Sequence, residues 1–254
     1  MSENRERCDV GLKKQQGIQS VKFEEPPIIC AAASVVGQKE GDGPFGDVFD
    51  QIESDPKVGG DTWEDAEGRL QERAAELAIQ KAGCGKEAIR YIVAGDLLGQ
   101  LMASSFGLAG FDKPLFGVYG ACSTMGESIG IGSMLVEGGF ADYVLAMTSS
   151  HFASAEKQFR FPLGYANQRP KASTWTVTGS GAVVICKGDQ KQGMAKITGI
   201  TTGKIVDYGV KDTMNMGACM APAAASVVAA HFKDFGTDPS EYDQIITGDL
   251  GMVG

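Results

Sequence analysis

The chain has 254 residues, of which 43% are hydrophobic, and a formal net charge of -9. This length and apolar content suit one large α/β domain or two closely packed halves, and they exclude an extensively disordered chain. The acidic balance excludes nucleic acid and anionic lipid as the main partner, because phosphate groups would be repelled over most of the surface.

The amino-terminal part predicts an arm, a strand and a long loop. Residues 1–20 are polar and lack the apolar core of a signal peptide, so we expect a loose N-terminal arm. The segment PIICAAASVV at 27–36 predicts a first buried strand. The glycine-rich loop GQKEGDGPFGD that follows is typical of a functional loop or an interaction surface.

A well-delimited helix is predicted next. Thr62 can cap a helix over 63–81, and Gly83 can end it in a left-handed conformation. Small and apolar side chains recur on one face of this helix, which indicates packing against a sheet. They are Ala66, Leu70, Ala74, Leu77 and Ala78.

A strand at 91–94 and a shorter helix at about 101–108 continue the pattern. Between them, Gly95 and Asp96 form a turn at the carboxyl end of the strand. The regular alternation of strands and helices predicts an α/β fold.

The stretch 115–151 predicts one βαβ unit with a thiol at its turn. Residues 115–119 suit a strand that is covered on both faces, and the small residues after it leave room for a tight turn. Cys122 then lies at the N-terminus of an amphipathic helix that ends near Gly138. A second buried strand returns to the sheet and ends at His151.

Residues 152–174 lack a clear period, contain two prolines and carry a basic cluster, so we expect a loop-rich excursion. Two interpretations of the cluster stand: a solvated basic surface, or a local anion site on an acidic protein. The segment 175–186 predicts a strand, a glycine-flanked bend at 179–181 and a further buried strand.

The six cysteines form no C-x-x-C pair and no zinc-like spacing with the two histidines. This usage indicates reduced thiols of a cytosolic protein and no structural metal. We expect no bound cofactor.

An internal repeat relates the two ends of the chain. Residues 88–97 and 242–250 align around a shared Gly-Asp-Leu, and each follows an Ala-rich helix and a strand. We therefore predict a first half at 21–187 and the start of a second half at 188–254. The second half is expected to be incomplete in this chain, because it stops after its Gly-Asp-Leu.

Several motifs resemble a known family. GACSTMGESI at 120–129 and GGFADYVLA at 138–146, with the duplicated halves, are similar to the thiolase-like superfamily. A more specific resemblance is to the stage V sporulation protein AD family. It rests on PFGDVFD at 44–50, AGDLLGQ at 94–100, TSSH at 148–151, FRFP at 159–162 and WTVTGSGAVV at 175–184.

The resemblance implies a thiolase-like α/β fold with duplicated βαβ halves, each a five-stranded sheet flanked by helices. It also implies binding of dipicolinic acid (pyridine-2,6-dicarboxylate), free or as its calcium chelate, and support of its transport into developing spores and its release at germination. The implied partners are membrane proteins of the same transport complex, at the cytoplasmic side of the inner membrane of the forespore or spore. Thiolase-like proteins commonly pair through the first half, which implies a homodimer.

Cys122 is the centre of the expected site. A helix N-terminus presents free N–H groups and partial positive charge, which stabilise a thiolate, an oxyanion or a carboxylate. The residue therefore suits a nucleophile of acyl-CoA chemistry, a pocket floor for a small carboxylate, or simply a buried thiol that fills the start of a helix. Thiolases also need a histidine and further residues from the second half, so we expect binding and no catalytic residue.

Five other side chains complete the expected ligand-binding set. His151 and Asp96 follow strands, and ligands of open α/β sheets gather at the carboxyl ends of strands. A hydrogen-bonded structural imidazole and a repeated structural turn are the alternatives for these two residues. Ser150 precedes His151, and Arg160 and Arg169 can pair with a dicarboxylate through planar guanidinium groups.

Overall fold

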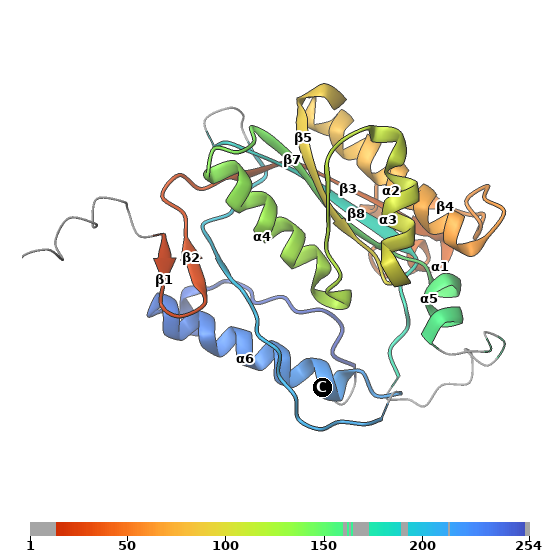
Figure 1. Cartoon of the computed structure of the whole chain (residues 1–254). Coiled ribbons are helices and arrows are strands. Elements are labelled where there is room, and N and C mark those ends of the chain that lie inside the picture. The colour runs from red at the N-terminus through yellow and green to blue at the C-terminus, as the bar shows by residue number, and fades with distance from the viewer. Residues whose placement is uncertain are drawn as a thin grey trace, which may run out of the picture.

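The computed structural model describes residues 14–159, 162, 164, 173–188, 193–212 and 214–251. Strands and helices alternate along most of this range (Figure 1). In chain order they are β1 Gln15–Gln16, β2 Ser20–Lys22, β3 Ile28–Gly37, α1 Gln38–Gly41, β4 Gln51–Glu53, α2 Trp63–Ala82, β5 Ile89–Gly95, α3 Met102–Gly107, β6 Leu115–Gly117, α4 Thr124–Glu137, β7 Tyr143–Ser150, α5 Phe152–Phe159, β8 Gly179–Cys186, β9 Ala195–Lys196, β10 Gly199–Thr201 and α6 Gly217–Phe235.

The main sheet has the strand order β4-β3-β8-β7-β5-β6, and β9 pairs with β3. β8 runs antiparallel to its neighbours β3 and β7, whereas the remaining pairs along this order are parallel. The carboxyl ends of β3, β5, β6 and β7 therefore meet at one edge of the sheet, where β8 begins.

The helices α2 and α4 cover opposite faces of this sheet (Figure 1). On the α2 face, Leu70 and Ala74 pack with Leu145 and Met147 of β7. On the α4 face, Val136 packs with the intervening residues of β7, Val144 and Ala146. Since successive side chains of a strand point to opposite faces, each strand contributes to both cores.

The predicted limits of α2 are confirmed at both ends. The Thr62 hydroxyl accepts a hydrogen bond from the Asp65 backbone N–H at 3.1 Å. Gly83 ends the helix at φ 59°, in the left-handed region that glycine adopts without a Cβ clash.

A smaller antiparallel sheet, β1-β2-β10, lies beside α6. Asp234 of α6 fastens this sheet, because its carboxylate accepts hydrogen bonds from Ile18 N (3.0 Å), Gln19 N (3.0 Å) and the Ser20 hydroxyl (2.8 Å). The described part of the expected N-terminal arm is therefore paired with elements from the far end of the chain. Residues 1–13 lie outside the described residues.

The structure differs from the sequence predictions at four further places. Residues 115–119 were expected to form a strand covered on both faces, but β6 is an edge strand with all three residues exposed. The bend expected at 179–181 lies inside the continuous strand β8. α5 occupies the first part of the expected loop excursion, and residues 242–250, which align in the repeat with the segment that forms β5, contain no strand.

Within the described residues, no helix combines the length and the apolar character needed to cross a bilayer.

Candidate functional site

The carboxyl edge of the main sheet brings together three of the predicted sequence positions. Asp96 follows β5, Cys122 follows β6, and His151 follows β7. Their side chains divide between the two faces of the sheet. The turn with Cys122 leads into α4, whereas Asp96 and His151 make their contacts on the α2 side.

Cys122 lies in a single 3-10 turn, Ala121–Ser123, directly before α4. Ala121 has φ 48°, a left-handed conformation that is strained for a residue with a Cβ. Cys122 is exposed, and its Sγ lies 3.8 Å from Sδ of Met220 in α6. The thiol therefore lies where the turn before α4 contacts α6.

The surroundings of Cys122 do not favour its thiolate form. Partial removal of the thiol from solvent raises its pKa, which outweighs the lowering effect of a backbone N–H at the start of the helix. One turn further along, the Glu127 carboxyl group contacts the hydroxyl of Ser123, the residue after Cys122. The site at neutral pH thus presents a neutral S–H group.

Asp96 has a structural role in the turn after β5. It is 1% exposed and accepts hydrogen bonds from Leu98 N (2.8 Å), Ser104 N (2.7 Å) and the Ser104 hydroxyl (2.6 Å). These bonds tie the end of β5 to α3. Gly95 before it is required, because a Cβ there would lie 1.9 Å from the Val118 carbonyl oxygen.

His151 is also held in the interior. Its Nδ1 accepts a hydrogen bond from Ala153 N at 3.1 Å, so Nε2 carries the hydrogen and donates it to Pro56 O at 2.8 Å. Burial lowers the pKa of the imidazole, and the ring lies 5.5 Å from that of Trp63. The imidazole is therefore neutral, with both nitrogens engaged.

Of the other three predicted ligand residues, the structure describes Ser150. The Ser150 hydroxyl donates to Val177 O at 2.6 Å, which joins the end of β7 to the segment before β8. Arg160 and Arg169 lie outside the described residues.

A buried polar network on the α2 face was missed by the sequence analysis. Gln71 Nε2 donates to the hydroxyls of Ser149 (2.7 Å) and Ser104 (3.0 Å), and the Ser149 hydroxyl donates to Glu67 Oε1 at 2.9 Å. Glu67 and Gln71 are both 0% exposed. The available signal was an acid and an amide one helical turn apart, beside the apolar stripe of α2.

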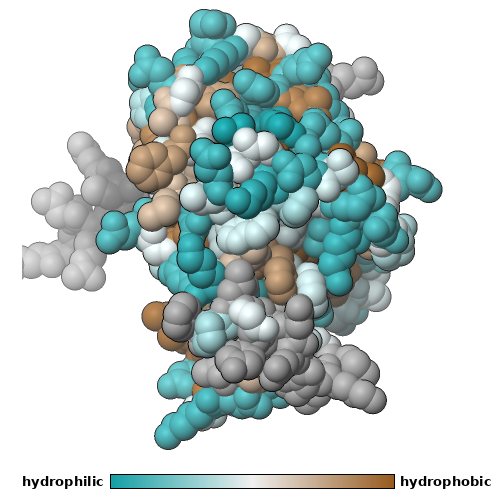
Figure 2. Space-filling view, turned by 90° about the vertical axis from the view of Figure 1, so that its right-hand side faces the viewer, coloured by the Kyte–Doolittle hydropathy of each residue, from teal (hydrophilic) through white to brown (hydrophobic). Residues whose placement is uncertain are grey.

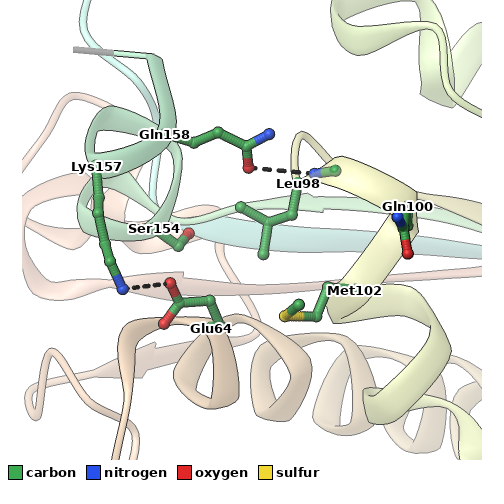
Figure 3. Close-up of a pocket in the computed structure, with 8 residues that line it drawn as sticks. Glu64, Leu98, Gln100, Met102, Ser154, Lys157 and Gln158 are labelled. Carbon is green, nitrogen blue, oxygen red and sulfur yellow. Dashed lines mark hydrogen bonds and ion pairs between the residues drawn. The ribbon is translucent and has the colours of Figure 1, made fainter. Parts of the chain in front are cut away.

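A pocket of about 400 Å³ opens next to this network, between α2, α5 and the turn after β5 (Figure 3). Lys157 Nζ pairs with Glu64 Oε1 at 2.7 Å along one side, and Gln158 Oε1 accepts from Gly99 N at 3.1 Å. The remaining lining comes from Leu98, Gln100, Met102 and Ser154. None of the four predicted ligand residues that the structure describes, Cys122, His151, Ser150 and Asp96, lines it.

Comparison with known proteins places these features in a family. The model of a family described as stage V sporulation protein AD matches residues 17–254. The chain is 44% identical over 241 residues to stage V sporulation protein AD of Bacillus subtilis (strain 168), which covers 95% of this chain and 70% of that relative.

Solved structures show the fold. A variant of Xanthomonas campestris OleA matches with a TM-score of 0.55 at 15% identity, over 94% of this chain and 79% of that one. The 3-oxoacyl-(acyl carrier protein) synthase III of Pseudomonas aeruginosa PAO1 matches with a TM-score of 0.52 at 15% identity, over 85% and 73%. The synthase III of Xanthomonas oryzae matches with a TM-score of 0.50 at 16% identity, over 91% and 86%. The predicted thiolase-like α/β fold is confirmed.

Proposed function

Because the chain belongs to the stage V sporulation protein AD family, we propose that it binds dipicolinic acid without converting it to another compound. In this role it supports the movement of the acid into the developing spore and its release at germination. The single observation that carries the proposal is the family match, which extends over nearly the whole chain.

We propose that the acid binds at the Cys122 turn, between the start of α4 and α6. A neutral thiol and the backbone N–H groups of a first helical turn are hydrogen-bond donors that suit a carboxylate. The raised pKa of Cys122 supports a donor and disfavours a permanent thiolate, which would repel an anionic ligand. The Glu127 carboxyl group, which contacts Ser123 at the start of α4, favours the calcium chelate, in which the metal offsets the carboxylate charges.

The contacts of the histidines support binding over turnover. Activation of a cysteine nucleophile needs a base within hydrogen-bond reach. His151 makes its contacts on the α2 side of the sheet, and His231 is engaged with the Thr201 hydroxyl at 2.8 Å and the Tyr242 hydroxyl at 2.7 Å. Neither imidazole is among the contacts of Cys122.

The alternative function is acyl transfer with Cys122 as nucleophile. It is supported by the strained residue Ala121 and by the fold, which is shared with 3-oxoacyl-(acyl carrier protein) synthase III. The two functions differ in the chemistry of the thiol. Incubation with acyl-CoA followed by mass spectrometry yields a covalent adduct on Cys122 if the alternative holds, and an unmodified chain if the protein only binds.

Calorimetric titration of the full chain with dipicolinic acid, with and without calcium, tests the proposal. We expect binding, and a dissociation constant about tenfold weaker for Cys122→Ala, because one hydrogen bond to a charged group contributes about 1.5 kcal/mol. Cys219→Ala, which removes another exposed thiol on α6, is the matched control and keeps the wild-type affinity. Absence of binding at millimolar ligand would refute the proposal.

The proposed partners are membrane proteins of the same complex, to which the chain docks at the inner membrane, and a second copy of the chain. The homodimer is supported by β6, a free sheet edge whose residues Leu115 and Phe116 are exposed. Sedimentation equilibrium tests it: Phe116→Lys on the edge is expected to give monomers, whereas a monomeric wild-type chain at micromolar concentration contradicts it.

A further inference from the structure

Glu67 joins three elements of the α2 face through its carboxyl group. Oε1 lies 2.9 Å from the Ser149 hydroxyl of β7, and Oε2 lies 2.6 Å from the Ser154 hydroxyl of α5. Both serines are at most 5% exposed, and Glu67 itself is 0% exposed. The seating of α5 on α2 therefore depends on a side chain that has no access to solvent.

The hydrogens of this network can be assigned one by one. Gln71 donates to the Ser149 hydroxyl, so the Ser149 hydrogen points to Glu67 Oε1. The Ser154 hydroxyl has one hydrogen but two acceptors in reach, Glu67 Oε2 and His151 O at 3.0 Å. An ionised Glu67 takes this hydrogen. A protonated Glu67 donates from Oε2 to Ser154 Oγ, which then donates to His151 O, so both oxygens of the Glu67 carboxyl group and the Ser154 hydroxyl are engaged.

The charges around Glu67 favour a bound proton. On α2, Glu64 is paired with Lys157 of α5, and Asp96 after β5 contributes a second negative charge. On α5, Glu156 accepts from Thr176, and His151 after β7 is neutral. No ion pair among the described residues includes Glu67.

We propose that Glu67 is a proton-binding site that couples the seating of α5 to pH. With the proton on Oε2, the carboxyl group and Ser154 hold α5 against α2. Without it, a buried negative charge lies next to Glu64 and Asp96 with no cation in contact, and α5 separates more readily.

The electrostatics agree with this assignment. Burial raises the pKa of Glu67 to about 7, although the two serine hydroxyls act in the opposite direction. The proton is therefore exchanged near neutral pH. Because α5 supplies Ser154, Lys157 and Gln158 to the pocket in Figure 3, the same proton controls one wall of that pocket.

Hydrogen exchange of the full chain tests the proposal. After correction for intrinsic exchange rates, we expect amide protection in α5 to fall by about tenfold between pH 6 and pH 8 in the wild type. Glu67→Gln, whose amide can donate to Ser154 as the protonated acid does, is expected to lose this dependence. Glu156→Gln, a second buried acid on α5, is the matched control and retains it.

A direct titration makes the proposal independent of the variants. The carboxyl ¹³C resonance of Glu67 in the wild-type chain is expected to titrate with a midpoint near pH 7. A midpoint below pH 5, or an unchanged pH dependence of α5 exchange in Glu67→Gln, would overturn the proposal.

Discussion

The two faces of the main sheet differ most at its carboxyl edge. On the α2 face, called the closed face below, Asp96, His151 and Glu67 are buried with their polar atoms engaged, and the pocket of Figure 3 opens beside them. On the α4 face the edge is open, and Cys122 is exposed beside α6. The same edge thus carries buried, hydrogen-bonded polar side chains on one face and an accessible thiol on the other.

The difference shows why residues that end neighbouring strands need not share a site. The side chains of β7 alternate between the faces, so Leu145 and Met147 pack with α2, whereas Val144 and Ala146 pack with α4. His151 continues the first series. A site at Cys122 is therefore built from α4 and α6, without the two predicted residues of the α2 face.

The largest expected effect comes from the closed face. Asp96→Ala leaves Leu98 N and Ser104 N buried without acceptors, and we expect the free energy of unfolding to fall by about 3 kcal/mol. Asp249, at the equivalent position of the repeat, is exposed and accepts only from Gly251 N among the bonds described. Asp249→Ala is the control, with a change of about 0.5 kcal/mol or less, and urea unfolding measures both.

A smaller loss is expected for His151→Ala, which removes the bonds to Pro56 and Ala153 and costs about 2 kcal/mol. Dipicolinic acid affinity should stay within about twofold of the wild type, since His151 lies on the face away from Cys122. A tenfold loss of affinity in a folded His151→Ala protein would show that His151 contributes to the ligand site, and would contradict the assignment of the two residues to separate sites.

The pH profile of stability should reveal two opposing groups on the closed face. Glu67 has its folded-state pKa raised to about 7 from 4.5, so its contribution decreases as pH rises from about 4.5 to 7. His151 has its pKa lowered from 6.5, so its contribution is lost as pH falls below about 6.5. The wild-type profile is expected to be nearly flat between pH 5 and pH 7, because the two contributions change with pH in opposite directions. The slope of each is limited to about 1.4 kcal/mol per pH unit.

Glu67→Gln removes the contribution of Glu67 to the pH dependence of the free energy of unfolding and leaves that of His151. Its stability should therefore fall steadily as the pH is lowered from 7 to 5, by about 1 kcal/mol. Thermal unfolding at fixed ionic strength measures this change. A profile parallel to that of the wild type would contradict the assignment.

The smallest effect on stability is expected for a substitution on the open face. Cys122→Ala should change the free energy of unfolding by about 0.5 kcal/mol or less, because the side chain is exposed. Its reactivity is the sharper measure. The rate of alkylation by iodoacetamide is expected to keep rising above pH 9.0, the ordinary pKa of a thiol, because the pKa of Cys122 is raised. A plateau near pH 7 would indicate an activated nucleophile.

Much of the fold could be predicted from the sequence. The cap at Thr62, the apolar stripe of α2 and the stop at Gly83 are local signals, and local physics decides them. The errors at 115–119 and 179–181 have a different origin. An apolar run does not reveal its place in the strand order, and β6 is exposed because it pairs on one side only.

The candidate site was predicted in part. The position of Cys122 before α4 followed from a strand, small turn residues and a helical period, all contiguous in the chain. The network of Glu67, Gln71 and Ser149 was not predicted, because its members come from α2 and β7 and their hydrogen bonds exist only after these elements pack.

By itself, the sequence determined the family, the α/β class and a thiol at a helix start, since these depend on motifs and on periods of neighbouring residues. Only the tertiary structure decided the face on which each strand-end residue lies, the engagement of His151 with Pro56, and the burial of Glu67. The physical reason is that strand pairing and alternation assign each side chain to a face, and burial on that face then sets its charge and its partners.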